Sequence, residues 1–257
     1  MSENFGHYSR YYDLLYADKD YAGEVAYVRA LIDKHSTRAS TSLLELGCGT
    51  GIHAGLLSAG GIDVMGVDMS DDMLDAARLR AASRGSEKGS VSFHHGDART
   101  FRAGSTFGAV AALFHVLSYQ TSEADLNAMM ETAAIHLQAG GLFLFDFWYG
   151  PAVLWQRPSV RTKRLSDDLI SVTRIADPVI HDADNVVDVN YEVFITERAT
   201  GQTQQLRETH KMRYLFMPEI DRLLAAHGFE RVQAEEWMTR KTPSLDSWGV
   251  CVVARKR

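Results

Sequence analysis

Short apolar runs alternate with amphipathic stretches along the first 150 residues of the chain. The apolar runs predict five strands, at 42–46, 63–67, 91–93, 108–114 and 142–147. The stretches between them predict helices over 52–59, 70–84 and 122–137. Strands that alternate with helices indicate a parallel sheet with helices on both faces, and nearly continuous apolar strands suit burial on both sides.

The pattern changes after Pro151, where β-branched and aromatic residues become frequent and turn residues separate the runs. Two or three antiparallel strands are predicted within 169–176, 186–198 and 202–215. A helix over 218–227 and two strands, 231–236 and 249–254, then complete the sheet. The segment 151–215 is too small to fold alone, so we expect one domain, 1–257, in which it is a small antiparallel β insertion after the fifth strand.

The composition of the 257-residue chain, 46% apolar and 23% charged, is that of a soluble globular protein. Basic residues number 27 and acidic residues 33, so no basic surplus favours an extended nucleic-acid groove. Two cysteines exclude a disulfide framework and a zinc site. We expect no membrane span and no signal peptide, because no apolar run is long enough for either, and a location in the cytoplasm.

A glycine loop gives the strongest chemical signal. Gly47, Gly49 and Gly51 follow the first strand and open a helix, and they leave no Cβ where a ligand must touch the backbone. A dinucleotide loop needs its third glycine one position later, where Ile52 stands. Glu45 would repel a pyrophosphate, but its carboxylate can hold an ammonium group. This pattern suits the amino-acid end of S-adenosylmethionine better than a nicotinamide dinucleotide.

Acidic residues follow the next two strands. Asp68 ends the second strand, where a carboxylate can accept both ribose hydroxyls of an adenosine. Met69 and Met73 are candidates to pack on the adenine, although a methionine in such a helix also suits the core. Asp97 beside the small Ala98, after the third strand, can accept from the adenine amino group.

These motifs resemble the class I S-adenosylmethionine-dependent methyltransferases over about residues 40–150 and 218–257. The resemblance implies an α/β, Rossmann-like sheet of seven mostly parallel strands in the order 3-2-1-4-5-7-6, with the seventh strand antiparallel. The cofactor would lie across the carboxyl ends of strands one to four. The residues that carry the resemblance are Glu45, Gly47, Cys48, Gly49, Gly51, Asp68, Asp97, Ala98 and Phe114.

The first 40 residues are crowded with tyrosines and are expected to form a lid. Tyr12 and Tyr16 are predicted to close over the cofactor, because aromatic faces attract a sulfonium cation, although simple aromatic packing explains them equally well. The Tyr12-Asp13 pair and the run 19–21 resemble the N,N-dimethyltransferases that act on nucleotide-linked amino-sugars. That resemblance implies that 41–150 and 216–257 form the cofactor core, and that 151–215 shapes the acceptor pocket and a homodimer contact.

Methyl transfer requires a neutral nucleophile held in line with the departing sulfur. His115 is the best candidate base, and Tyr119 can accept or orient through its hydroxyl. The N,N-dimethyltransferases that act on amino-sugars have a histidine at the position of Tyr119 and an arginine at the position of Trp248. Both differences concern contacts with the acceptor. Further acceptor-pocket candidates are Asp146, Trp148, Tyr149, Arg174, His181, Tyr191, His210 and Tyr214.

No metal-binding constellation is predicted, since the Asp182 and Asp184 pair suits a turn. The favoured function is N-methylation of an amino-sugar with S-adenosylmethionine. The alternatives are O-methylation of a hydroxyl or carboxylate on another small molecule, a nicotinamide-dependent oxidoreductase, and a protein that binds S-adenosylmethionine without catalysis.

Overall fold

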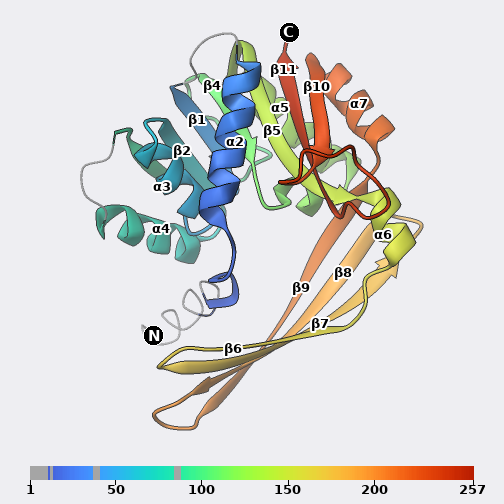
Figure 1. Cartoon of the computed structure of the whole chain (residues 1–257). Coiled ribbons are helices and arrows are strands. Elements are labelled where there is room, and N and C mark those ends of the chain that lie inside the picture. Colours follow the sequence, from blue (N-terminus) through green and yellow to red (C-terminus); the bar gives the residue numbers. More distant parts are fainter. Residues whose placement is uncertain (1–10, 12–13, 37–40, 84–87) are drawn as a thin grey trace.

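A computed structural model describes residues 11, 14–36, 41–83 and 88–257 (Figure 1). Its central sheet has seven core strands in the order β3-β2-β1-β4-β5-β11-β10. Strand β11 is antiparallel to both of its neighbours, which confirms the strand order implied by the resemblance. These strands are β1 (Ser42–Leu46), β2 (Asp63–Asp68), β3 (Val91–His95), β4 (Phe107–Ala112), β5 (Leu137–Tyr149), β10 (Phe229–Glu236) and β11 (Gly249–Lys256).

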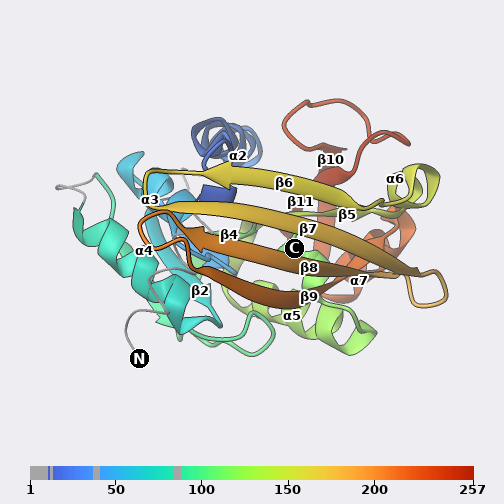
Figure 2. The same cartoon turned by 90° about the horizontal axis from the view of Figure 1, so that it is seen from below.

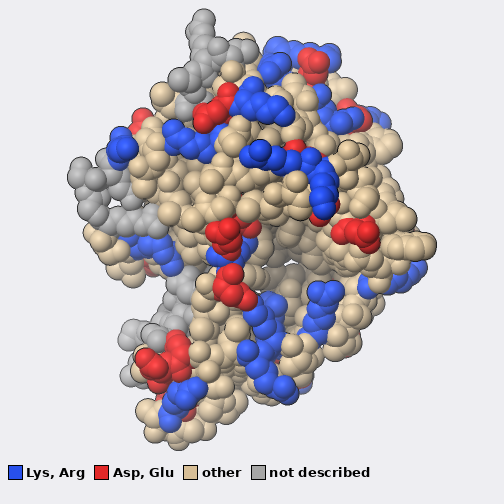
Figure 3. Space-filling model, viewed as in Figure 1, with Lys and Arg blue, Asp and Glu red and all other residues tan. Residues whose placement is uncertain are grey.

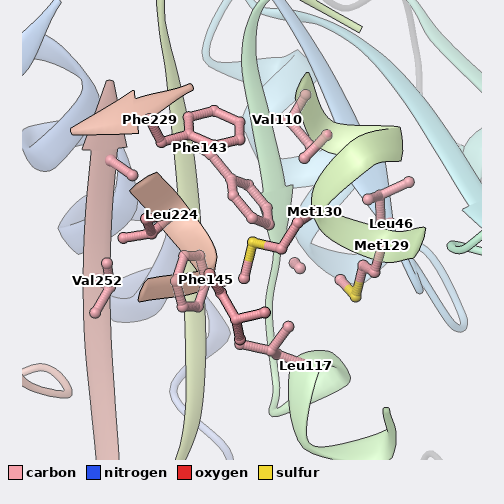
Figure 4. Packing of buried hydrophobic residues seen from close by; sticks show 14 of the residues in the cluster. Leu46, Val110, Leu117, Met129, Met130, Phe143, Phe145, Leu224, Phe229 and Val252 are labelled. Carbon is pink, nitrogen blue, oxygen red and sulfur yellow. The ribbon is translucent and has the colours of Figure 1, made fainter. Parts of the chain in front are cut away.

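Helices cover both faces of this sheet, because its strands carry apolar side chains on both sides. On one face Val28 of α2 and Leu57 of α3 pack with Leu43 of β1. On the other face Met130 of α5 and Leu224 of α7 belong to the same buried cluster as the aromatic side chains of β5 (Figure 4). The helices are α2 (Tyr21–His35), α3 (Ile52–Ala59), α4 (Asp71–Ser83), α5 (Glu123–Ile135) and α7 (Met217–Ala226).

The segment after β5 forms an antiparallel sheet of four strands that lies across the carboxyl edge of the core (Figures 1 and 2). It joins the core where β9 pairs with the last two residues of β5. Arg213, near the end of β9, is buried and forms an ion pair of 2.5 Å with Glu219 of α7. The segment comprises α6 (Gly150–Gln156), β6 (Arg161–Ser166), β7 (Ile170–His181), β8 (Val186–Glu197) and β9 (Thr203–Leu215).

Several boundaries differ from the predictions. The sheet has eleven strands rather than seven, because the insertion hydrogen-bonds to β5 and continues the sheet. The insertion has four strands rather than two or three, because the polar segment Arg161–Ser166 pairs along β7 as an edge strand. Strand β5 begins at Leu137, where helix 122–137 was expected to end. Helices α2 and α6 and the 3₁₀ turn η1 (Val116–Tyr119) were not predicted.

Within the described ranges, no helix is both long and apolar enough to cross a membrane.

Candidate active site

A cavity of about 620 Å³ lies between the carboxyl edge of the core and the inner face of the insertion, where Figure 3 shows the surface hollowed. Its walls come from the loops after β1 to β4, from η1, and from β7, β8 and β9. Fifteen of the predicted site residues line it: Tyr16, Gly47, Gly49, Asp68, Met69, Met73, Asp97, Ala98, Phe114, His115, Tyr119, Trp148, Arg174, Tyr191 and His210.

The glycine loop reaches the cavity in a backbone conformation that favours glycine. Gly47, Gly49 and Gly51 have φ of 72°, 52° and 70°. A Cβ on Gly47 would lie 2.6 Å from a methyl carbon of Val116, and one on Gly51 would lie 2.6 Å from the ring of Phe93. A Cβ on Gly49 would meet no protein atom within 4 Å, so this position leaves space for a ligand to contact the backbone. Gly47 and Gly51 are therefore needed for packing, and Gly49 is the position that leaves room for a ligand.

Glu45 lies behind the loop as a buried carboxylate, 1% exposed. Its Oε2 atom has no hydrogen-bond partner among the described residues, and its Oε1 atom lies 3.7 Å from His53 Nδ1. Burial raises the pKa of Glu45 to about 7, and the nearby Asp68 adds to this, while His53 and Lys19 oppose it. A buried carboxylate oxygen without a partner suits a cationic ligand group, because the pairing would offset the cost of burying the charge.

Asp68, at the end of β2, holds the glycine loop. Its Oδ2 accepts from the backbone N–H of Gly49 at 2.8 Å, and its Oδ1 accepts from that of Ser70 at 2.9 Å. Ser70 also caps α4, through a bond from Met73 N to its hydroxyl. Each carboxylate oxygen can accept a further bond, so Asp68 can pin the loop and still receive hydroxyl groups from the cavity.

Asp97 follows β3 and is bound by Arg99. The guanidinium of Arg99 bridges Asp97 and Asp125 of α5, and its hydrogen bonds lower the pKa of Asp97 below the usual range. The backbone N–H of Arg99 also donates to Asp97 Oδ1 at 2.8 Å. The carboxylate therefore stays ionised beside Ala98, and the arginine holds it in place at the edge of the cavity.

The lid residues meet the core at Phe114, whose φ is 66°. The ring of Tyr16 packs edge-on against Phe114 with centroids 5.0 Å apart. Lys19 Nζ lies 4.2 Å from the ring centroids of both Phe114 and Tyr21, and it forms an ion pair with Glu24. Tyr12 lies outside the described residues.

His115 is backed by a buried acid on the core side of the cavity. Its Nδ1 lies 2.7 Å from Oδ2 of Asp146, although the ring is not aligned for a regular hydrogen bond. The backbone N–H of His115 donates to both oxygens of the same carboxylate at 3.2 Å. His115 has φ 64°, so Asp146 holds both the strained backbone and the ring. The ring of Trp148 stands edge-on at 6.3 Å from the imidazole.

The insertion contributes a second histidine to the same cavity. The hydroxyl of Tyr119 lies 2.7 Å from Nδ1 of His210, and His210 Nε2 lies 3.3 Å from Glu208. The guanidinium of Arg174 lies 4.7 Å above the ring of Tyr191. All five side chains line the cavity. Glu208 was not predicted, although period-two alternation along β9 places it on the same face as His210.

The other predicted residues support the cavity from behind or lie elsewhere. Cys48 and Gly51 pack within the core under the loop. Tyr214 is fully buried beneath the insertion, and Tyr149 packs against the core cluster. His181 pairs with Asp188 instead of lining the cavity. Lining residues that the sequence did not suggest include Tyr11, Leu15, Arg99, Gln120 and Met212. No group of metal-ligating side chains is found in the described part of the chain.

Comparison with known proteins finds similarity in the part of the chain that holds the glycine loop. Residues 43–141 match the family model of a methyltransferase domain. The dTDP-3-amino-3,6-dideoxy-alpha-D-glucopyranose N,N-dimethyltransferase of Streptomyces fradiae is 35% identical over 148 residues, which are 57% of this chain and 55% of that protein. The dTDP-3-amino-3,4,6-trideoxy-alpha-D-glucopyranose N,N-dimethyltransferase of Streptomyces venezuelae is 35% identical over 142 residues, 54% of this chain and 56% of that protein. The chain spans about half the length of the curated relatives it matches.

Solved structures extend the likeness to almost the whole chain. An S-adenosylmethionine-dependent methyltransferase from Clostridium acetobutylicum superposes with a TM-score of 0.81 at 19% identity and covers 99% of each chain. DesVI of Streptomyces venezuelae superposes with a TM-score of 0.80 at 24% identity, over 97% of this chain and 98% of its own. The chain therefore has the fold of the class I S-adenosylmethionine-dependent methyltransferases. The match of residues 43–141 to the methyltransferase-domain model agrees with the resemblance that the motifs carry.

Proposed function

We propose that the protein transfers a methyl group from S-adenosylmethionine to the amino group of a nucleotide-linked amino-sugar. One observation carries this proposal: a single cavity joins Gly49 and Asp68, on the donor side, to His115 and Tyr119, on the acceptor side. Donor and acceptor must meet in one enclosed space for an in-line transfer. The two dTDP-amino-sugar dimethyltransferases among the relatives support the choice of acceptor.

The donor side fits S-adenosylmethionine by its chemistry. The unpartnered carboxylate oxygen of Glu45 would take the amino group, and Gly49 would allow the ligand against the backbone. Asp68 would accept from the ribose hydroxyls, and Asp97 with Ala98 would receive the adenine amino group. The sulfonium supplies a methyl group that is already activated, so the protein need only position the nucleophile and keep its lone pair free.

The remaining predicted donor contacts surround these groups. Met69, which is 60% exposed, and Met73 line the cavity and would cover the adenine. Tyr16 and Phe114 would place aromatic faces near the sulfonium, where a cation is attracted. In this proposal the N-terminal residues that line the cavity, Tyr11, Leu15 and Tyr16, act as a lid within one domain, and 151–215 cover the acceptor. The lid does not extend over all of 1–40 as expected, because α2 packs on the core sheet through Val28.

On the acceptor side, two groups can take a proton from the amine. His115 is held by the buried Asp146, and Tyr119 projects from η1. Trp148 and the stacked pair of Arg174 and Tyr191 offer aromatic and cationic surfaces suited to a charged sugar nucleotide.

The test uses calorimetry followed by isotope transfer. The protein should bind S-adenosylmethionine and not NAD. It should then move a labelled methyl group to dTDP-3-amino-3,6-dideoxy-alpha-D-glucopyranose, but not to the same sugar nucleotide with a hydroxyl in place of the amine. Transfer to the hydroxyl compound alone would establish O-methylation. Binding without transfer to any acceptor would point to a non-catalytic protein.

We also propose that two copies pair through the insertion. Trp155, Val160 and Val179 lie in or beside it with exposed apolar side chains, 69%, 61% and 47% exposed. Exposed apolar groups of this size suit a protein contact. Sedimentation should show a dimer, and replacing Trp155 and Val179 with serine should yield a monomer.

A further inference from the structure

We propose that Tyr119, His210 and Glu208 form a proton-accepting chain for the acceptor amine. In this chain the core supplies the hydroxyl that touches the substrate, and the insertion supplies the base behind it. The inference rests on the proposed function and names residues of the same site.

The side chains of Tyr119, His210 and Glu208 contact one another in that order along the cavity wall. Tyr119 Oη lies 2.7 Å from His210 Nδ1, and His210 Nε2 lies 3.3 Å from Glu208 Oε2. Tyr119 lies at the end of η1, is 47% exposed and lines the cavity. Residues 208 and 210 are alternate positions of β9 and therefore share one face of the strand.

The charges around His210 fix the direction of the chain. An ionised Glu208 only accepts hydrogen bonds, so it favours the tautomer of His210 that carries its proton on Nε2. Nδ1 is then the acceptor, and the hydroxyl of Tyr119 is the donor. The other groups that face His210 are the ring of Tyr191, at 5.1 Å between centroids, and Arg174 behind that ring. Of these neighbours Glu208 is the acid, and its carboxylate can pair with an imidazolium formed on His210.

The proposed step balances as follows. The ammonium form of the acceptor breaks an N–H bond and gives its proton to Tyr119 Oη, while the Tyr119 O–H bond breaks and its proton moves to His210 Nδ1. The imidazolium is then paired with the carboxylate of Glu208, and it later releases its proton to water. The freed amine lone pair forms the N–C bond as the C–S bond of the sulfonium breaks, and the electron pair of that bond stays on sulfur. A second methylation would use the same route, since each product is again an ammonium.

The contacts of His115 and His210 suit the two histidines of the cavity to different roles. His115 is bound to a carboxylate that is itself 1% exposed and that also fixes the His115 backbone. Such a pair suits positioning. His210 instead reaches a hydroxyl that faces the cavity, and its acid partner is part-buried at the cavity wall. The insertion would then provide a proton acceptor as well as cover the acceptor.

The test is the pH profile of kcat in the full chain, with labelled S-adenosylmethionine and dTDP-3-amino-3,6-dideoxy-alpha-D-glucopyranose. Tyr119→Phe and His210→Gln should each lower kcat about 100-fold. The double variant should lose no more than either single one, because the residues act as a unit. Glu208→Gln should lower kcat about tenfold and move the acid-side midpoint to lower pH, since His210 becomes a weaker base. Affinity for S-adenosylmethionine should change less than about twofold in all of them.

Glu192→Gln is the matched control. Glu192 lies on the neighbouring strand, on the opposite face of the insertion, where it pairs with Arg207. It should keep both kcat and the midpoint. The chain is refuted if Tyr119→Phe or His210→Gln keeps kcat within about threefold, or if Glu208→Gln leaves the midpoint unmoved. If His210→Gln does not fold, the other two variants decide. Failure of the unchanged protein to methylate this acceptor would instead refute the proposed function, and the chain with it.

Discussion

Replacing Glu45 with glutamine should make the protein more stable at alkaline pH and weaken its binding of S-adenosylmethionine. The carboxylate is 1% exposed, and one of its oxygens has no partner among the described residues. Glutamine keeps the volume and removes the charge. The two effects have opposite signs because the charge that is costly in the free protein is the charge that would hold the ligand ammonium.

The magnitude follows from the pKa of Glu45, which burial raises from 4.5 to about 7. Because the folded state holds this proton more tightly than the unfolded state, the stabilisation is complete below about pH 4.5 and is lost as pH rises through 7. The free energy of unfolding of Glu45→Gln, measured relative to that of the unchanged protein, should therefore increase by roughly 2–3 kcal/mol from pH 5 to pH 8. The neighbouring charges of Lys19, His53 and Asp68 modify the pKa of Glu45 that burial has raised.

The same pKa predicts the pH dependence of ligand binding. If the ligand requires ionised Glu45, its Kd should be about tenfold larger at pH 6 than at pH 8. In Glu45→Gln that dependence should disappear, and the Kd at pH 8 should rise about ten- to a hundredfold, the loss of a charged hydrogen bond.

Urea unfolding at pH 5 and pH 8 and calorimetry at pH 6 and pH 8 measure the two effects. Glu230→Gln, at an exposed position of β10, is the control and should change neither. The reasoning would be wrong if Glu45→Gln lost stability at pH 8, or if it bound S-adenosylmethionine as tightly as the unchanged protein.

Four further substitutions, with Arg207→Met as a control, test the proposed donor side and the attachment of the insertion. Asp68→Ala should raise the Kd for S-adenosylmethionine about ten- to a hundredfold in calorimetry, and an unchanged Kd would remove Asp68 from the site. Gly51→Ala should lower the free energy of unfolding by about 2–4 kcal/mol, because its Cβ would overlap an aromatic ring of β3. Gly49→Ala should lower the free energy of unfolding by only about 1 kcal/mol but weaken the binding of S-adenosylmethionine. Equal losses of stability in Gly49→Ala and Gly51→Ala would contradict the different roles of the two glycines. Arg213→Met should lower the free energy of unfolding by about 3–5 kcal/mol, since it leaves a buried carboxylate of α7 unpaired, whereas the exposed Arg207→Met should stay within about 0.5 kcal/mol.

The position of the residues of the proposed donor side could be predicted from the sequence because these residues are tied to strand ends. Parallel strands bring their carboxyl ends to one edge, so Gly49, Asp68 and Asp97 meet there once the strands are recognised. Strand β5 was harder to delimit: the predicted helix ran to 137 and the predicted strand began at 142, yet Leu137 already pairs with Phe107, and the register shifts after it.

The acceptor side depends on contacts between distant residues. Tyr119 and His210 are 91 positions apart, and no local pattern joins them. Asp146 was expected to line the pocket, but strand alternation cannot tell a residue at the surface of a cavity from one buried just behind it. Strand β6 was missed because an edge strand with polar side chains lacks an apolar run.

The insertion leaves and rejoins the core at almost the same point. Strand β5 ends at Tyr149, and the last residue of β9, Leu215, pairs with that same tyrosine. The pairing of β5 with β11 beside this junction does not involve the residues of the insertion. A segment whose two ends are already adjacent can be replaced without breaking the strand pairs of the core. Grafting the corresponding segment of a relative between positions 150 and 215 is thus a direct route to hybrids that test the proposed acceptor role of this segment while Gly49 and Asp68 are kept.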